Sequence, residues 1–404
     1  MVNINKDAVL QRVPELKLLI DSSNNIKIYF EGKIIHCGHH GLSLIDAFYQ
    51  PTSLNEALSK LQAHIKGAQD WMDLVTTFVH LHEAGILRDE TQKSPTVKID
   101  PHGYDAAPIH ISLLNDRERT TNLIRGIYEV VHPEDIVVEI GTGTGILAIA
   151  AARAGARHVY AIEASGFSKL AKEIFKANGL SNQITLIEGW STQTDLPEPA
   201  DVLISDLISS EPLAENALEI IADANKRLLK SNARFVPNRM KIFAIPVTIP
   251  RAELRKYKFL PETLDNWKSW YEIDFGLLGE AAKNSPHTFY IDPYLAIDWI
   301  SLSDPVPLAE VEFKKVSQLT IDNKIAITTN TSGQVDGLLE YFDLELGPNT
   351  HYSTHPKQVD KYCVRRNPVW VFPEPLILKK GDQFTVAYQY RKTEDKTKVS
   401  ILHS

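Results

Sequence analysis

The stretch Glu139-Ile140-Gly141-Thr142-Gly143-Thr144-Gly145-Ile146-Leu147 decides the fold of this 404-residue chain. It follows the apolar run IVVEI (136–140), which predicts a buried strand, and it opens the run ILAIAAARAGA, which predicts a helix. Three glycines between a strand and a helix let the backbone turn sharply and let a ligand lie against the main chain. The stretch therefore predicts a ligand-binding loop at the start of a parallel α/β sheet.

The spacing of these glycines separates two classes of cofactor. The dinucleotide fingerprint G-x-G-x-x-G would require glycine at position 146, which is Ile146. Its pyrophosphate also needs a free helix N-terminus, whereas S-adenosylmethionine carries no phosphate. The next apolar run ends at Glu163, 18 residues after Gly145, where a carboxylate can accept hydrogen bonds from both hydroxyls of a ribose. We therefore expect S-adenosylmethionine; a nucleotide-dependent oxidoreductase and a tight turn beside a surface acid are the alternatives.

The pattern of apolar residues divides the chain into three regions. Residues 1–92 predict a small α+β, winged-helix-like domain. Residues 104–246 alternate strand and helix, which predicts a parallel α/β, Rossmann-like sheet. Together with the expected cofactor, this makes the region a candidate S-adenosylmethionine-dependent methyltransferase domain. Residues 247–404 contain alternating strands such as LEYFDLEL and DQFTVAYQY, which predict a β-barrel. A helical insertion at about 262–284 interrupts these strands.

Local signals define the elements of the first region. The runs IKIYF (26–30) and KIIHC (33–37) flank Glu31-Gly32 and predict a hairpin. Ser53-Leu54-Asn55-Glu56 is a capping box and predicts a helix start. A second helix is expected from about residue 69 to residue 84, because apolar residues recur there at helical spacing.

Composition excludes several classes of partner. Hydrophobic residues make up 43% of the chain and charged residues 23%, and no apolar run approaches the length of a membrane-spanning helix. The formal net charge of −8 argues against a general nucleic-acid binder and is compatible with a cationic substrate. Cys37 and Cys363 are the only cysteines, and the first residues lack a secretion signal, so we expect a cytoplasmic protein without disulfides.

Three histidines and a cysteine near the first hairpin form a candidate metal cluster: His36, Cys37, His39 and His40. The alternation of a strand points His36 and Cys37 to opposite faces. No second pair of ligands follows nearby in the sequence. We therefore expect no metal site.

A motif upstream of the glycines connects the chain to a known family. Its residues follow the pattern Y-x5-H-x2-L-L-x-D-x2-R, from Tyr104 to Arg119. Together with the glycine loop it resembles the protein arginine methyltransferase family, over about 104–404, with Leu113 replacing the usual Met. The resemblance implies that Arg119 pairs with the cofactor's carboxylate, which a guanidinium fork fits through two parallel hydrogen bonds. The implied cofactor-binding residues are Tyr104, His110, Arg119, Glu139, Gly141, Gly143, Gly145, Glu163 and Glu188.

The stretch DVLISDLISSEPLAENALEII (201–221) resembles the family's double-acid loop, in which two Glu nine positions apart grip the acceptor guanidinium. Those positions are Asp206 and Glu215 here, so the first acid is one methylene shorter. Glu211 lies between them and is the alternative to Asp206 as the working partner. Two carboxylates would hold the fork in one orientation and bias the cation so that one nitrogen recovers lone-pair density.

The stretch Tyr352-Ser353-Thr354-His355-Pro356-Lys357-Gln358 resembles the family's Thr-His-Trp loop. Pro356 stands where the family has the Trp that walls the arginine pocket, so we expect a different acceptor site. The resemblance implies that His355 pairs with Asp116 and thereby ties the barrel to the active site.

The helical insertion at 262–284 occupies the place of the family's dimerisation arm, which implies a homodimer. Its aromatic residues are either contacts of that arm or part of the barrel core: Trp267, Trp270 and Tyr271.

The first region resembles the small PqqD-like domains that bind leader peptides of ribosomally made natural products. Such domains capture a peptide by adding a strand to a sheet edge. A DNA-reading winged helix is the rival, but residues 1–92 hold 8 Lys+Arg against 11 Asp+Glu, a balance of −3, which disfavours it. A purely structural cap is the third alternative.

These features predict an S-adenosylmethionine-dependent N-methyltransferase acting on arginine side chains of a peptide or protein, such as a leader-guided precursor. A peptide-binding scaffold that has lost the chemistry is one alternative, motivated by Asp206 and Pro356. A methyltransferase for another acceptor is the second, although an acidic loop repels an anionic acceptor. The identity of the acceptor, the number of methyl groups and the oligomeric state are left open.

Overall fold

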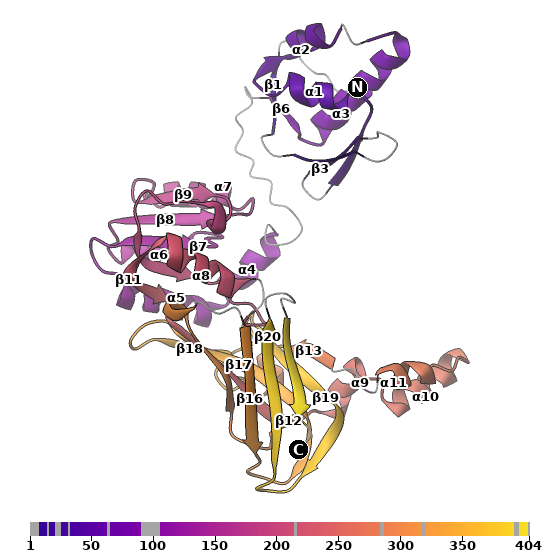
Figure 1. Cartoon of the computed structure of the whole chain (residues 1–404), viewed down its shortest axis with the longest axis vertical. Helices are drawn as coiled ribbons and strands as arrows, with labels where there is room; N and C mark the ends of the chain where they lie inside the picture. Colours follow the sequence, from indigo (N-terminus) through magenta and orange to yellow (C-terminus); the bar gives the residue numbers. More distant parts are fainter. Residues whose placement is uncertain are drawn as a thin grey trace. The chain divides into compact units, whose positions relative to one another are not determined.

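The computed structural model describes residues 8–13, 16–20, 26–30, 33–62, 65–89, 106–213, 216–282, 287–316, 320–391 and 396–402. Tyr104 and Glu215, two of the predicted site residues, lie outside them. Contacts divide the chain into two compact units, Met1–Lys98 and Ile99–Ser404, each shown in Figure 1. The methyltransferase-like and barrel-like regions therefore share one unit. Among the described residues, no helix has the length and apolar character needed to cross a bilayer.

The described part of unit 1 contains two small antiparallel sheets and three helices around one core. The first sheet has the order β5-β1-β6 and the second has the order β2-β3-β4. Their apolar faces and those of the helices enclose Ile28, Leu44, Phe48, Leu74 and Leu81. The elements are β1 (Val9–Arg12), β2 (Lys17–Ile20), β3 (Ile26–Phe30), β4 (Lys33–Cys37), α1 (Gly41–Ala47), β5 (Thr52–Ser53), α2 (Leu54–Leu61), α3 (Ala68–Glu83) and β6 (Leu87–Asp89).

The local predictions for this unit are confirmed. Strands β3 and β4 pair antiparallel, from Ile26 opposite Cys37 to Phe30 opposite Lys33. Helix α2 begins with the expected capping box, because the Ser53 hydroxyl accepts from the Glu56 amide while the Glu56 carboxylate accepts from the Ser53 amide. Helix α3 covers nearly the expected range.

Unit 2 begins with a five-stranded parallel sheet in the order β11-β10-β7-β8-β9. All five residues of β7 are buried, as expected for a central parallel strand. The elements are α4 (Ala107–Asn115), α5 (Arg117–Val130), β7 (Ile136–Ile140), α6 (Ile146–Arg153), β8 (His158–Glu163), α7 (Ser168–Ala177), β9 (Ile184–Glu188), η3 (Ser191–Gln193), β10 (Ala200–Ser205), α8 (Ala217–Arg227) and β11 (Leu229–Val236).

The strand order places a topological switch point at the carboxyl ends of β7 and β10. After β7 the chain builds β8 and β9 on one side, and it then crosses to β10 on the other. Ligands of open α/β sheets bind at such a switch point, outside the carboxyl ends of the strands. Residues that directly follow β7 and β10, the glycine loop and Asp206, therefore meet at one edge of the sheet.

The C-terminal part of unit 2 consists of antiparallel strands in a seven-stranded and a three-stranded sheet. The predicted fold class, a Rossmann-like methyltransferase domain followed by a barrel-like β domain, is confirmed. The elements are β12 (Arg239–Thr248), β13 (His287–Ile291), η4 (Pro293–Ala296), β14 (Ile300–Ser301), β15 (Val306–Glu312), η5 (Phe313–Lys315), β16 (Thr320–Thr328), β17 (Gly333–Glu345), β18 (His351–Ser353), β19 (Asn367–Leu378), β20 (Gln383–Arg391) and β21 (Lys396–Leu402).

Between β12 and β13 the chain forms a helical arm of α9 (Arg251–Tyr257), α10 (Pro261–Tyr271) and α11 (Gly276–Ala282), which extends away from the strands in Figure 1. Trp270 and Tyr271 are 64% and 59% exposed, so they are not barrel core. Trp267 instead lies edge-on between Phe259 and Phe275, within the arm itself. The insertion thus begins earlier than expected, because α9 also belongs to it.

Candidate active site

The glycine loop between β7 and α6 has a shape that larger residues cannot adopt without strain. Gly143 has φ +51° and Gly145 has φ +81°, in the left-handed region that favours glycine. A Cβ on Gly143 would lie 3.2 Å from the imidazole of His110, and one on Gly145 would lie 2.2 Å from the ring of Phe175. The glycines therefore let the loop turn at the carboxyl edge of the sheet while it packs closely against His110 and Phe175.

Glu163 ends β8 beside this loop. Its carboxylate accepts hydrogen bonds from the Gly143 amide (2.7 Å) and from the Ser165 amide (2.8 Å). Its side chain is buried, whereas Glu188, its partner in register at the end of β9, is exposed. Glu163 therefore presents a fixed acceptor next to the glycine backbone, the position expected for an acid that binds a ribose.

Glu139, the penultimate residue of β7, lies beneath the loop and is 1% exposed. Burial raises its pKa to about 8, and the nearby charge of Glu163 adds to the effect, while a hydrogen bond from the Thr142 hydroxyl opposes it. Glu139 is therefore mainly protonated at neutral pH. A neutral carboxyl group at this position avoids repulsion with Glu163 and keeps its own hydrogen bonds to the loop.

Helix α4 contributes His110 to the same edge. Its imidazole stacks on the ring of Phe167, with centroids 3.5 Å apart, and it lies against Gly143. Predicted cofactor residues from α4, β7 and β8 are thus brought together around one loop.

Arg119, on α5, contacts Asp206 directly after β10. Its Nη1 donates to Asp206 Oδ2, and its Nη2 donates to the carbonyl oxygen of Leu113 (2.7 Å). The Nε atom of Arg119 is buried and makes no hydrogen bond, and it lies 3.9 Å from Asp116 Oδ2. The structure therefore pairs Arg119 with the chain's own carboxylate, whereas the sequence prediction paired it with the carboxylate of the cofactor.

The other oxygen of Asp206 is also occupied by a guanidinium. Arg365, in the segment between β18 and β19, donates from Nη2 to Asp206 Oδ1 at 2.9 Å. All three side chains are largely buried: the exposed fraction is 7% for Arg119, 14% for Asp206 and 12% for Arg365. Both oxygens of Asp206 are therefore occupied by guanidinium groups of the chain itself, whereas the sequence prediction assigned Asp206 to the guanidinium of an acceptor. Sequence analysis missed Arg365, because nothing in its local pattern marks a residue 159 positions from its partner.

Glu211, the alternative acid, is held by the β domain. Its carboxylate accepts from the Tyr290 hydroxyl (2.9 Å) and from the Thr397 amide (2.8 Å). Burial raises the pKa of the nearby Glu340, on β17, to about 8, while a hydrogen bond from the Trp370 indole opposes the increase. Glu211 thus has fixed partners of its own, and it links the acidic loop to the barrel.

The predicted pairing of His355 with Asp116 is wrong. Asp116 caps α5 by accepting from the Arg119 amide (3.1 Å), and its other oxygen accepts from the Val364 amide (3.0 Å). His355 instead lies edge-on to the ring of Tyr341 and accepts from the Lys357 amide. Asp116 does tie the barrel to the methyltransferase sheet, but through the backbone next to Arg365. The pairing fails because the amide at the start of α5 competes for the same carboxylate, which caps that helix.

The arrangement fits S-adenosylmethionine. The glycine backbone, a buried carboxylate at Glu163 and the guanidinium of Arg119 converge at the switch point of the sheet. Gly141, Gly143 and Gly145 would hold the body of the cofactor and Glu163 its ribose, whereas Asp206 and the Leu113 carbonyl already engage Arg119.

One family model matches part of the chain. The model of ribosomal protein L11 methyltransferase (PrmA) matches residues 117–237, which is less than half of the chain. The matched segment runs from α5 through β11 and contains the glycine loop, Glu163 and Asp206. It supports the methyltransferase fold.

Several curated relatives are named as protein arginine N-methyltransferases. The chain is 26% identical over 318 residues to protein arginine N-methyltransferase 8-B of Danio rerio. The aligned residues cover 77% of this chain and 73% of the relative. It is 25% identical over 321 residues to protein arginine N-methyltransferase 1 of Saccharomyces cerevisiae, covering 75% and 86%. It is 28% identical over 254 residues to probable protein arginine N-methyltransferase 6 of Arabidopsis thaliana, covering 61% and 56%.

Solved structures share the fold of unit 2. A Trypanosoma brucei PRMT1 enzyme-prozyme heterotetrameric complex with AdoHcy aligns with a TM-score of 0.62 at 24% identity, covering 71% of this chain and 89% of that one. Arabidopsis thaliana protein arginine methyltransferase 10 aligns with a TM-score of 0.59 at 21% identity, covering 74% and 97%. The chain is thus similar in sequence to protein arginine N-methyltransferases and shares the fold of S-adenosylmethionine-dependent methyltransferases.

Proposed function

We propose that the protein is an S-adenosylmethionine-dependent N-methyltransferase whose acceptor is an arginine side chain of a peptide or protein. The observation that carries the proposal is Asp206, a carboxylate at the carboxyl edge of the sheet that binds two guanidinium groups beside the glycine loop. The names of the sequence relatives support the same acceptor. A homodimer built through the helical arm is compatible with its exposed apolar residues, among them Leu277.

S-adenosylmethionine supplies an electrophilic methyl group, so the protein's task is to orient the acceptor nitrogen and stabilise its charge. Asp206 provides one carboxylate for a guanidinium, and we propose Glu215 as the second. Because Arg365 already occupies Asp206, an acceptor arginine enters this position by displacing Arg365. Such an exchange keeps the carboxylate of Asp206 paired, and the displaced Arg365 guanidinium must reach solvent, because an isolated buried charge is costly.

The acceptor prediction is tested by mass spectrometry. Arginine-containing peptides encoded in the chromosomal neighbourhood are incubated with the full-length protein and S-adenosylmethionine. We expect a mass gain of about 14 Da per transferred methyl group, located on arginine by fragmentation. Glu215→Gln should lower turnover at least about 100-fold with cofactor affinity unchanged, because it removes one carboxylate from the acceptor clamp.

Glu211→Gln is the matched control for this test, since Glu211 is bound by Tyr290 and Thr397. Methylation of a residue other than arginine would disprove the acceptor claim. If Glu215→Gln kept full activity while Glu211→Gln lost it, Glu211 and not Glu215 would be the acid that binds the acceptor.

A second prediction concerns the cofactor. Glu163→Gln keeps the size of the side chain but removes the charge that a ribose diol would face. We expect the affinity for S-adenosylhomocysteine, measured by calorimetry, to fall about 10- to 100-fold, the value of one or two charge-assisted hydrogen bonds. Glu173→Gln, exposed on α7, is the control and should bind normally. Equal affinities of both variants for S-adenosylhomocysteine would show that Glu163 does not bind the cofactor.

A third prediction concerns Arg365. Arg365→Met removes the guanidinium that competes for Asp206 while Arg119 still pairs with it. We expect the KM for an arginine peptide to fall about fivefold or more with kcat little changed, because the acceptor no longer displaces a bound group. Arg366→Met is the matched control, since Arg366 is exposed and pairs with Asp292. A loss of kcat in Arg365→Met at unchanged KM would show that Arg365 only positions Asp206.

For unit 1 we propose the role of a PqqD-like module that captures a leader peptide. Strand β2 pairs with β3 on one side and is an edge strand of its sheet in the described part of the unit. All four of its residues are exposed, including Leu18, Leu19 and Ile20. An edge strand with apolar side chains on both faces favours the addition of a peptide strand.

The capture proposal predicts a change in KM alone. Leu18→Lys combined with Leu19→Lys places charges on the exposed edge without altering the core of unit 1. We expect at least about a tenfold higher KM for a precursor with its leader, because a docking site raises the effective concentration of the acceptor. A short peptide without the leader should react at the same rate with both proteins. Leu42→Lys, 42% exposed on α1, is the control, and an unchanged KM in the double variant would reject the proposal.

A further inference from the structure

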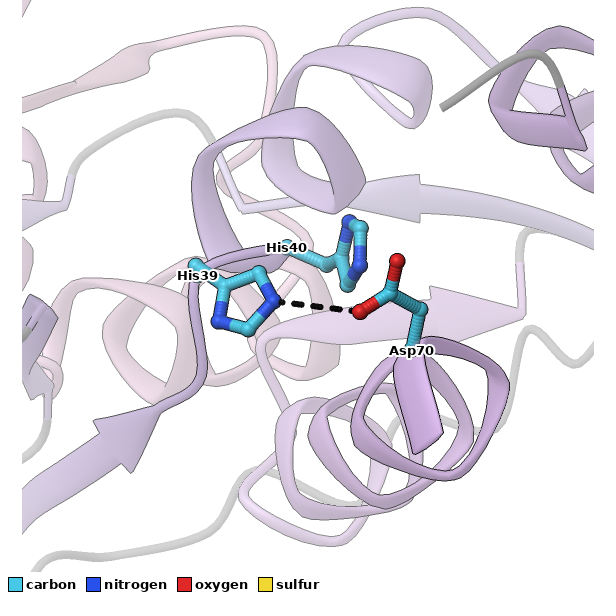
Figure 2. Close-up of side chains that lie close together, drawn as sticks. All are labelled: His39, His40 and Asp70. Carbon is cyan, nitrogen blue, oxygen red and sulfur yellow. Dashed lines mark ion pairs between the residues drawn. The ribbon is translucent and has the colours of Figure 1, made fainter. Parts of the chain in front are cut away.

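A turn in unit 1 brings two histidines next to the start of helix α3. His39 and His40 lie between β4 and α1, and Asp70 lies in the first turn of α3, 30 residues further along the chain. Figure 2 shows the three side chains grouped together. One nitrogen or oxygen of each lies within 4.8 Å of the others. The cluster joins two segments that the sequence gives no reason to pair.

His40 carries the strongest sign of a missing ligand. His40 is only 6% exposed, and its Nε2 atom is buried without a hydrogen-bond partner. A buried polar atom without a partner is costly, and native structures contain few of them. A metal ion satisfies such a nitrogen, because the lone pair of a neutral imidazole is a good ligand for transition metals.

The distances around His39 match a metal centre with an orienting acid. His39 Nε2 lies 3.6 Å from Asp70 Oδ1, close to the separation of roughly 3.4 Å between two ligands of a tetrahedral zinc ion. The other oxygen of Asp70 accepts from the Lys66 amide, which leaves Oδ1 for the ion. The second nitrogen of His39, Nδ1, lies 4.0 Å from Asp73 Oδ2. A carboxylate behind a ligating histidine is the usual second layer of such a site.

Asp73 also has an unsatisfied oxygen. Its Oδ2 is buried and has no hydrogen-bond partner, so it is available to accept from Nδ1 once Nε2 of His39 binds an ion. The backbone at Gly38 admits this carboxylate, because a Cβ there would lie 2.0 Å from Asp73 Oδ1. Cys37 stays outside the site, because its Sγ faces the carbonyl oxygen of Ile35.

We propose that His39, His40 and Asp70 bind a divalent transition-metal ion, zinc being the best match, with Asp73 orienting His39. Two imidazoles and one carboxylate suit zinc rather than magnesium or calcium, which prefer oxygen ligands alone. Three protein ligands leave the fourth position of a tetrahedral ion open. The ion would fasten the turn before α1 to the start of α3 and stabilise unit 1 in the folded state.

The test uses the full-length protein without an affinity tag, after treatment with a chelator and dialysis. Titration with Co²⁺, followed by its visible absorption, and competition with Zn²⁺ should show about one site per chain. His39→Gln and Asp70→Asn should each weaken binding at least about tenfold, and Asp73→Asn should weaken it about 10- to 100-fold, as for other carboxylates behind a ligating histidine. His36→Gln is the matched control, since His36 is exposed on β4 and outside the cluster.

His39→Gln is decisive because its side chain is 73% exposed, so the fold of unit 1 should not depend on it; circular dichroism checks this. His40→Gln, at the buried position, is a supporting variant only if its spectrum is unchanged. The proposal is overturned if the protein takes up no stoichiometric ion, if His39→Gln binds as tightly as the unmodified protein, or if His36→Gln weakens binding equally. None of these outcomes depends on the nature of the methyl acceptor.

Discussion

The charge on Asp206 constrains the whole of the candidate active site. This carboxylate follows β10, yet its partners come from α5 and from the segment before β19. Buried charges are costly unless they are paired, so the three elements must remain together for any of these side chains to be buried. Asp116 extends the same cluster, since it caps α5 and accepts from the backbone beside Arg365. The sheet and the β domain are therefore joined by ion pairs as well as by apolar packing.

The glycine loop depends on two other acids, Glu163 and Glu139, and repulsion between them is avoided because one of them is mainly neutral. Glu163 holds the backbone of Gly143, and Glu139 lies directly below the loop. Two ionised carboxylates so close to each other would repel, but burial keeps Glu139 mainly neutral at pH 7. The edge of the sheet thus presents one charged acceptor toward a ligand while the other acid acts as a neutral support.

Local signals in the sequence were enough to predict the strands and helices around the site, the capping box at Ser53 and the glycine loop. Each depends on residues that are neighbours in the chain. The pairing of Asp206 with Arg365 and the meeting of His39 with Asp70 depend on contacts between distant segments, which one sequence does not contain. The predicted contact between His355 and Asp116 was wrong for a related reason: an acid that begins a helix binds first to the amides of that helix.

The shorter acid at position 206 and the presence of Arg365 are physically connected. An aspartate reaches less far from its strand than a glutamate would, and Arg365 and Arg119 each donate to one of its two oxygens. Replacing Arg365 by an acceptor exchanges one guanidinium for another, so the cost of desolvating the carboxylate is already met in the folded protein. Selectivity must then come from the walls of the pocket and from the second acid. Proline stands at position 356, where the family resemblance implies a Trp that walls the arginine pocket, and we propose that this change gives the acceptor site a different shape.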